Sequence, residues 1–342
     1  MIGASGFAGA EARGGRRAEG GLTLIEVMVS ISVLSVLFLV ILRSTSLVGD
    51  TTFSLESQST MLIELRKAVS RMHEDISTAR KVYEEDVTGR SYIDRMDFGT
   101  WPPISTSLLP DIANLGDFDR DAVGVRRVGN FLLLVGEMAP HNYYDAGTAR
   151  TYRVSVYRLV AYYIADYGYP VTQGLSSFDL VRWESAAFVD RTTLTSVTDP
   201  TVRANVVTSL QTEKNIYYAW DPSATADLAF YELTSDIAGA PDGSFQIPWC
   251  TVSDNTQDRL PRTYFRKRNA ALVANNDATG EAAVPKFAQK VAGNPGFPNG
   301  FEVMVIGPSG SRKILARVVA QRAFAGKVVY SKSETIATMR DI

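Results

Sequence analysis

The sequence predicts an α+β fold in which one long N-terminal helix packs on an antiparallel β-sheet that carries loop-rich insertions. Three observations lead to this prediction. Residues 22–42 form an apolar run, apolar residues recur at helical spacing from Leu55 to Ala79, and strand-like segments and loops follow from Gly89 onward. Helical and strand-like periodicities thus occupy separate parts of the chain, which is typical of this fold class.

The apolar run is long enough to cross a membrane. It reads LTLIEVMVSISVLSVLFLVIL and holds a single charge, Glu26, in 21 residues. At ~1.5 Å per residue, such a helix spans roughly the 30 Å of a bilayer core. A carboxylate deep in a membrane segment costs about 2.5–3.5 kcal/mol, so we expect Glu26 to have a functional partner. The alternative is a position at the membrane edge, where the carboxylate costs little.

The residues before the run separate it from an ordinary secretory signal. The leader is rich in glycine, contains three arginines and ends at Gly21. A signal peptide places its apolar stretch before the cleavage site. Here a cut between Gly21 and Leu22 leaves the apolar stretch on the mature protein.

This order of residues resembles the N-terminal signature of the type IV pilin and pseudopilin family. That signature is a Gly at the end of a basic leader, an apolar first mature residue, a Glu at mature position five, and then an apolar helix. Gly21, Leu22 and Glu26 match it in order. Two positions depart from the commoner pattern, because Leu22 replaces Phe and Glu19 makes the leader less basic.

The resemblance implies a route of processing and assembly. A prepilin peptidase would cut after Gly21 and methylate the new amine of Leu22, and Glu26 would neutralise the N-terminal amine of a neighbouring subunit in a filament. An ionised carboxylate in an apolar bundle needs such a positive partner. The implied partners are the peptidase, other pilin or pseudopilin subunits, and an inner-membrane assembly platform. The resemblance implies neither an enzymatic activity nor a cofactor.

We predict four consecutive parts of the chain. They are a leader peptide at 1–21, a transmembrane or filament-core helix at 22–42, an amphipathic continuation of that helix at 43–83, and a globular, β-rich, pilin-like domain at 84–342 with an inserted subdomain at about 192–300. One helix from Leu22 to about Lys81 would be about 90 Å long. The apolar stripe of the continuation consists of Leu55, Leu62, Leu65, Val69, Met72, Ile76 and Ala79. His73 falls beside Glu74 and Asp75, on what we interpret as a solvated face of the helix.

The globular domain is predicted from its strand-like segments. Residues 130–137 form a candidate buried strand. We expect residues 152–167 to pair with 178–185, and residues 301–307 to pair with 313–324 across a turn, each as an antiparallel hairpin. The order of a long helix, a Tyr-rich strand and a later strand ending in an apolar-Arg pair resembles W-type minor pilins and J-type minor pseudopilins, though more loosely than the N-terminal signature does.

A weaker motif carries alternating carboxylates. Asp117, Asp119 and Asp121 have the spacing of calcium-loop ligands, but Ala122 and Val128 stand where an EF-hand needs Gly and Glu. We favour an acidic surface turn, and calcium binding is the alternative.

Other functional classes have little support. Residues 262–268 read RTYFRKR, a basic and aromatic mixture of the kind that lines single-strand DNA grooves, but the chain carries a net charge of −2. DNA binding is therefore the minority interpretation. Cys250 is the single cysteine, so the chain has no internal disulfide and no Cys/His cluster for zinc. Neither G-x-S-x-G nor H-E-x-x-H occurs, and we predict no enzymatic activity.

The sequence therefore predicts a structural minor pilin of a type IV pilus, because the 321 residues left after removing 21 from 342 are bulky for a major filament subunit. The alternatives are a minor pseudopilin of a type II secretion system, a DNA-binding competence pilin, and an anchored protein that never polymerises. Arg13, Arg16 and Arg17 predict a cytoplasmic leader. The protein would then cross the inner membrane once, hold its C-terminal domain outside the cytoplasm, and later enter a pilus or pseudopilus.

Overall fold

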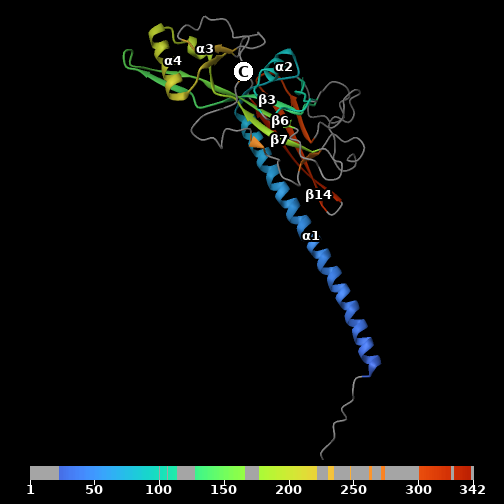
Figure 1. Cartoon of the computed structure of the whole chain (residues 1–342). Coiled ribbons are helices and arrows are strands. Elements are labelled where there is room, and N and C mark those ends of the chain that lie inside the picture. Colours follow the sequence, from blue (N-terminus) through green and yellow to red (C-terminus); the bar gives the residue numbers. More distant parts are fainter. Residues whose placement is uncertain are drawn as a thin grey trace, which may run out of the picture. The chain divides into compact units, whose positions relative to one another are not determined.

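The structure is a computed structural model, and it describes residues 23–99, 101–105, 107–113, 128–165, 177–221, 230–234, 247, 262–263, 271–273, 300–324 and 327–339. The chain divides into two compact units, Met1–Leu55 and Glu56–Ile342. Figure 1 traces the helices and strands along the chain. The predicted α+β class is confirmed, because a long N-terminal helix precedes a mainly antiparallel sheet.

The described part of the first unit is helical. Helix α1, Leu24–Thr78, begins in this unit and contains no proline in its 55 residues. The large apolar side chains of its first turns are exposed, with Leu24 at 79% and Leu34 at 70%. The helix predicted from the apolar run is therefore confirmed from Leu24 onward.

In the second unit, α1 buries one side against the sheet. Its buried stripe consists of Met61, Leu65, Ala68, Val69, Met72 and Ile76, and these residues recur at the three- and four-residue spacing that places them on one face. Four residues of the predicted helical stripe belong to this set. Leu55, by contrast, is 61% exposed, and the predicted stripe did not include Met61 and Ala68.

The predicted continuation of the helix to residue 83 is wrong at its end. Helix α1 ends at Thr78, and strand β1, Ala79–Val82, follows at once. β1 pairs antiparallel with β3, Phe131–Glu137, and an ion pair between Arg80 and Glu137 links the same two strands. Since Ser77 and Thr78 are weak helix formers, the pairing with β3 outweighs continuation of the helix.

The strands of the described residues join into one 13-stranded sheet and a separate two-stranded ribbon. The main path is β10-β9-β8-β6-β7-β12-β14-β13-β2, with β3 and β1 added through β6, β11 beside β7, and β15 beside β14. Most pairs are antiparallel, but β8 pairs parallel with β9, and β13 with β2. The ribbon consists of β4, His141–Asp145, and β5, Arg150–Val154.

Both predicted hairpins are confirmed as strand pairs. β6, Val156–Ala165, pairs antiparallel with β7, Ser177–Glu184, although the predicted turn between them lies outside the described residues. β13, Phe301–Ile306, pairs antiparallel with β14, Arg312–Phe324, and β15, Lys327–Met339, extends this pair. The turn before β14 contains two glycines at φ +105° and +87°, a backbone region that favours glycine.

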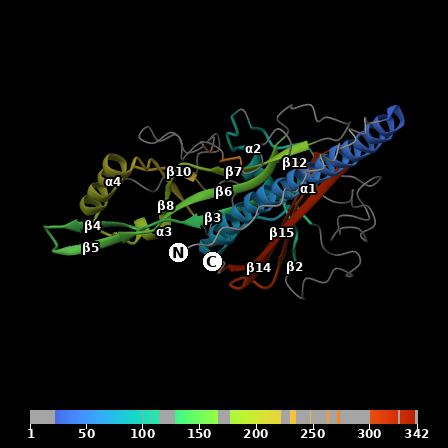
Figure 2. The same cartoon turned by 90° about the horizontal axis from the view of Figure 1, so that it is seen from below.

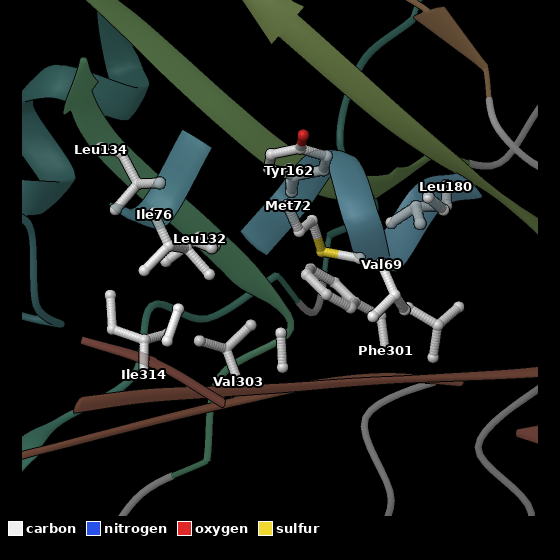
Figure 3. Packing of buried hydrophobic residues seen from close by; sticks show 14 of the residues in the cluster. Val69, Met72, Ile76, Leu132, Leu134, Tyr162, Leu180, Phe301, Val303 and Ile314 are labelled. Atoms are coloured by element: carbon white, nitrogen blue, oxygen red, sulfur yellow. The ribbon is translucent and has the colours of Figure 1, made fainter. Parts of the chain in front are cut away.

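The main core lies between α1 and two parts of the sheet. In Figure 3, Val69, Met72 and Ile76 of α1 meet Leu132 of β3 and Phe301 of β13. Alternate residues of β3 and β6 point into a second core on the opposite face. That face also packs α2, Val87–Asp94, and several aromatic rings. The strands β3 and β6 are therefore buried on both faces, as their nearly unbroken apolar sequences predict.

A third core lies beside the ribbon and forms a separate lobe. Figure 2 shows the ribbon, β4 and β5, near α4. We call the elements around this core the ribbon lobe. Besides the ribbon, it contains two helices, α3 (Arg191–Thr195) and α4 (Pro200–Lys214). It also contains three short strands, β8 (Phe188–Asp190), β9 (Tyr218–Trp220) and β10 (Phe230–Glu232). The predicted subdomain at about 192–300 stays a prediction, since most residues after 234 lie outside those described. The short strands β2, Ile112–Ala113, β11, Arg262–Thr263, and β12, Ala271–Val273, complete the large sheet.

Candidate functional site

The first turn of α1 contains the one predicted assembly residue that the structure describes. Glu26 accepts two hydrogen bonds through Oε2, from the Thr23 N–H at 2.9 Å and from the Thr23 hydroxyl at 3.1 Å. The Glu26 N–H donates in return to Thr23 Oγ1 at 3.3 Å. This reciprocal arrangement is a capping box, in which Thr23 is the N-cap and Glu26 the third residue of the helix.

The capping box fixes the carboxylate at the positive end of the helix. A negative charge is favoured there, because the first backbone N–H groups of a helix have no partners within it. Both hydrogen bonds that the Glu26 side chain accepts from Thr23 use Oε2. Glu26 Oε1 is therefore oriented by the cap and can accept a hydrogen bond from a positively charged donor of another molecule.

Apolar side chains surround this carboxylate along the helix. By length and composition, α1 is the one described helix that could cross a membrane, and its most apolar part is wholly exposed. Ser32 and Ser35 donate to the carbonyl oxygens of Met28 and Ile31, so these hydroxyls are satisfied within the helix. An exposed apolar surface of this extent needs lipid or other apolar chains around it.

Several predicted site residues lie outside the described part of the chain. Gly21 and Leu22, the residues of the predicted cleavage site, precede it. The three candidate calcium ligands Asp117, Asp119 and Asp121 lie in the gap at 114–127. Within the described ranges, no three His, Cys, Asp or Glu side chains gather where they could hold a metal ion.

Comparison with known families addresses this same end of the chain. Residues 16–42 match the family model described as the prokaryotic N-terminal methylation motif. This is the type IV pilin and pseudopilin signature. The matched residues include the predicted cleavage site and Glu26, so the predicted resemblance is confirmed. Comparisons with curated proteins and with solved structures give no match.

The matched motif covers the apolar first part of α1. The chain is accordingly pilin-like or pseudopilin-like at this end, and its apolar helix fits membrane anchoring. The motif also implies processing by a prepilin peptidase and assembly with other pilin subunits.

A buried charge cluster between α1 and the sheet was missed by sequence reasoning. Arg182 of β7 donates from Nε to Asp75 Oδ2 at 2.6 Å and from Nη2 to Asp75 Oδ1 at 3.0 Å. The Tyr162 hydroxyl donates to the same carboxylate at 2.5 Å, and Arg182 also pairs with Glu184. Arg182 is 2% exposed, so this cluster lies inside the core.

The charge cluster holds its arginine ionised. Burial alone lowers the pKa of Arg182, but the hydrogen bonds and charge of Asp75 outweigh this and raise it well above the ordinary value. Asp75 belongs to α1 and Arg182 to the sheet, so the pair fixes the second-unit part of α1 against β6 and β7. The cluster is structural, since every group in it is directed at another protein group.

Proposed function

We propose that this protein is a minor pilin of a type IV pilus, cut by prepilin peptidase after Gly21 and methylated on Leu22. Glu26 then accepts the N-terminal amine of a neighbouring subunit. The observation that carries the proposal is the match at residues 16–42, whose glutamate lies in a capping box at the start of an exposed apolar helix. The protein acts as a structural subunit, and its function is not catalytic.

The chemistry of Glu26 supports the pairing. In a filament core the carboxylate loses water, and an ionised group without a partner there is costly. The new amine is the positive group that cleavage creates, and each subunit brings one. The cap from Thr23 orients the carboxylate before assembly, which reduces the entropy lost when the pair forms.

A minor pseudopilin of a type II secretion system is the second candidate, because the matched motif is common to pilins and pseudopilins. The size of the chain supports a minor role in either system. Deletion separates the two: loss of surface pili supports the first, and loss of exoprotein secretion with intact pili supports the second.

The test compares wild type with Gly21→Val, Glu26→Ala and Glu56→Ala in cells. Mass spectrometry of the wild type should show Leu22 as the first residue, N-methylated, and Gly21→Val should remain uncut. Glu26→Ala should be cut and membrane-inserted, but its content in sheared filaments should fall by more than about tenfold, since breaking a buried ion pair costs roughly 3–5 kcal/mol.

Glu56→Ala is the matched control, because Glu56 is an exposed carboxylate on the same helix beyond the apolar run. It should enter filaments at the wild-type level. A mature chain that starts anywhere other than Leu22 contradicts the proposed processing. Wild-type incorporation of Glu26→Ala contradicts the proposed pairing.

A further inference from the structure

The ribbon lobe contains a buried histidine that pilin-like assembly does not use. His141, at the start of β4, is 4% exposed, and Ser209 of α4, which faces it, is 7% exposed. Apolar side chains of the same lobe surround them, among them Val206 and Leu210 of α4 and Val154, which is opposite His141 in the ribbon. The β4–β5 ribbon and α4 lie near each other (Figure 2), and His141 and Ser209 form a polar pair between them in an apolar core.

A chain of hydrogen bonds runs through this contact. His141 Nε2 lies 2.9 Å from Ser209 Oγ, and the Ser209 hydroxyl donates to Glu213 Oε1 at 2.9 Å. A hydroxyl has one proton, and Ser209 gives its proton to Glu213. His141 Nε2 must therefore be the donor to Ser209. The neutral ring then has its proton on Nε2, and Nδ1 is unprotonated.

Acid adds the second proton at Nδ1. Burial of the ring, which is 4% exposed, disfavours the added charge. The charged groups near the ring are Glu213 and Lys214, both on α4. Burial is the main cause that lowers the pKa of His141, Glu213 opposes it, and Lys214 adds to it.

We propose that His141 makes the contact between α4 and the β4–β5 ribbon an acid-sensitive latch, which loosens as the imidazole becomes protonated. In the open lobe the ring meets water and titrates near its ordinary value of about 6.5. In the closed lobe it binds a proton less readily. Between the two pKa values the open lobe therefore binds more protons, so the closed lobe is fully stable above about pH 6.5 and loses stability as the pH falls below it.

The consequence is a change in exposed surface. Opening the latch separates α4 from the ribbon and uncovers apolar residues such as Val206 and Leu210. The opening equilibrium should rise by up to about tenfold for each pH unit between the two pKa values. The main core should not respond, because His141 is the one histidine among the described buried residues and it lies in the ribbon lobe.

The first test is the titration of the two histidines in the full chain in detergent micelles. The chain contains only His73 and His141, so two imidazole Cε1–H resonances suffice to follow both by NMR. His73 is exposed on α1, where its Nδ1 lies 2.9 Å from the Thr335 hydroxyl. The titration midpoint of His141 should lie below the ordinary histidine value of about 6.5. An equal or higher midpoint for His141 overturns the proposal.

The second test is hydrogen–deuterium exchange at pH 5.5 and pH 7.5, corrected for intrinsic exchange rates. Peptides from α4 and the ribbon should lose protection at pH 5.5, while peptides from β13 and β14 keep it. His141→Gln should abolish this acid response, because its amide can still donate to Ser209 but cannot be protonated. His73→Gln is the matched control and should respond as wild type.

An acid response that persists in His141→Gln overturns the proposal, as does a wild type with equal protection at both pH values. If His141→Gln has already lost protection in α4 and the ribbon at pH 7.5, the titration midpoint of His141 in the wild type alone tests the proposal. That measurement needs no variant.

Discussion

Asp75 and Arg182 show how a helix is fixed to a sheet by a charge pair inside the core. Both residues are nearly inaccessible, and the guanidinium and carboxylate make two hydrogen bonds to each other. The hydroxyl of Tyr162 donates a third hydrogen bond to the same carboxylate. A buried ion pair of this kind contributes little net stability compared with apolar residues, but removing one partner leaves a charge without compensation.

We expect Arg182→Met to lower the free energy of unfolding by about 3–5 kcal/mol, because Asp75 then loses its bidentate partner and keeps only the Tyr162 hydroxyl and the more distant Arg71, at 3.7 Å. Thermal unfolding of the detergent-solubilised chain, followed by near-UV circular dichroism, measures the loss. Arg66→Met is the matched control: Arg66 is an exposed arginine on the same helix, and its change should be within about 0.5 kcal/mol.

The double variant Asp75→Leu with Arg182→Met should recover most of this loss, because it removes both charges together. A loss for Arg182→Met no larger than that for Arg66→Met would show that the buried pair does not hold α1 on the sheet.

Residues differ in how far the sequence could predict them. Glu26 was predictable because its signal is local: one carboxylate in an apolar run, four residues after the glycine-leucine step. The Thr-x-x-Glu spacing of the capping box was also present in the sequence, but the box was not predicted from it. The sequence placed Asp75 on a solvated helix face with His73 and Glu74, and this is wrong for Asp75 alone. Its partner is 107 residues away, so no local pattern could reveal the pair.

At the scale of elements, Gly129 joins two parts of the large sheet. Its N–H donates to Val303 O at 2.9 Å, and the Val303 N–H donates to Gly129 O at 2.8 Å. The backbone of residues 108–110 crosses directly over it. A Cβ at this position would lie 2.4 Å from Pro110 N and 2.6 Å from the carbonyl carbon of Leu109. Only glycine allows this approach.

Gly129→Ala should therefore destabilise the domain by about 1–3 kcal/mol, since backbone atoms must move apart to admit one methyl group. Gly136→Ala, in β3, is the control: its Cβ would meet Val160 Cγ2 at 3.6 Å, an ordinary contact. We expect it to be neutral or to stabilise by up to about 1 kcal/mol. Equal melting temperatures for the two variants would contradict this account of Gly129.

Elements with strong periodicity were predicted well, whereas helix α4 and the end of α1 were not. Strands β3, β6, β7, β13 and β14 were found because their apolar sequences are bounded by turn residues. Helix α4 was missed within a stretch interpreted as loop-rich. Its signals were present: Asp199 caps two N–H groups, Pro200 occupies the first turn, and Asn215 ends the helix in the left-handed region. The end of α1 depended on pairing with β3, which no local pattern shows.

At the scale of the whole molecule, the arginines of the leader predict an orientation in the membrane. Arg13, Arg16 and Arg17 should hold the leader in the cytoplasm, and the second unit should lie outside. Alkaline phosphatase fused after Ile342 should therefore be active, and a reporter that works only in the cytoplasm should be inactive. Replacing the three leader arginines by glutamine should reduce the phosphatase activity, whereas Arg43→Gln should not. The opposite pattern of reporter activities would contradict this orientation.

The packing of α1 against β13 and β14 also sets an order of events in biosynthesis. Met72 and Ile76 are made early, but Phe301 and Ile314, which share their core, emerge from the ribosome only after more than two hundred further residues. Such a distant contact forms slowly, because the long chain between the partners must first be brought together. Until then the apolar stripe of the nascent helix is not packed against β13 and β14 and stays exposed. Chaperones or proteases can act on this surface. The protein is thus most vulnerable between synthesis of its first helix and completion of its last strands.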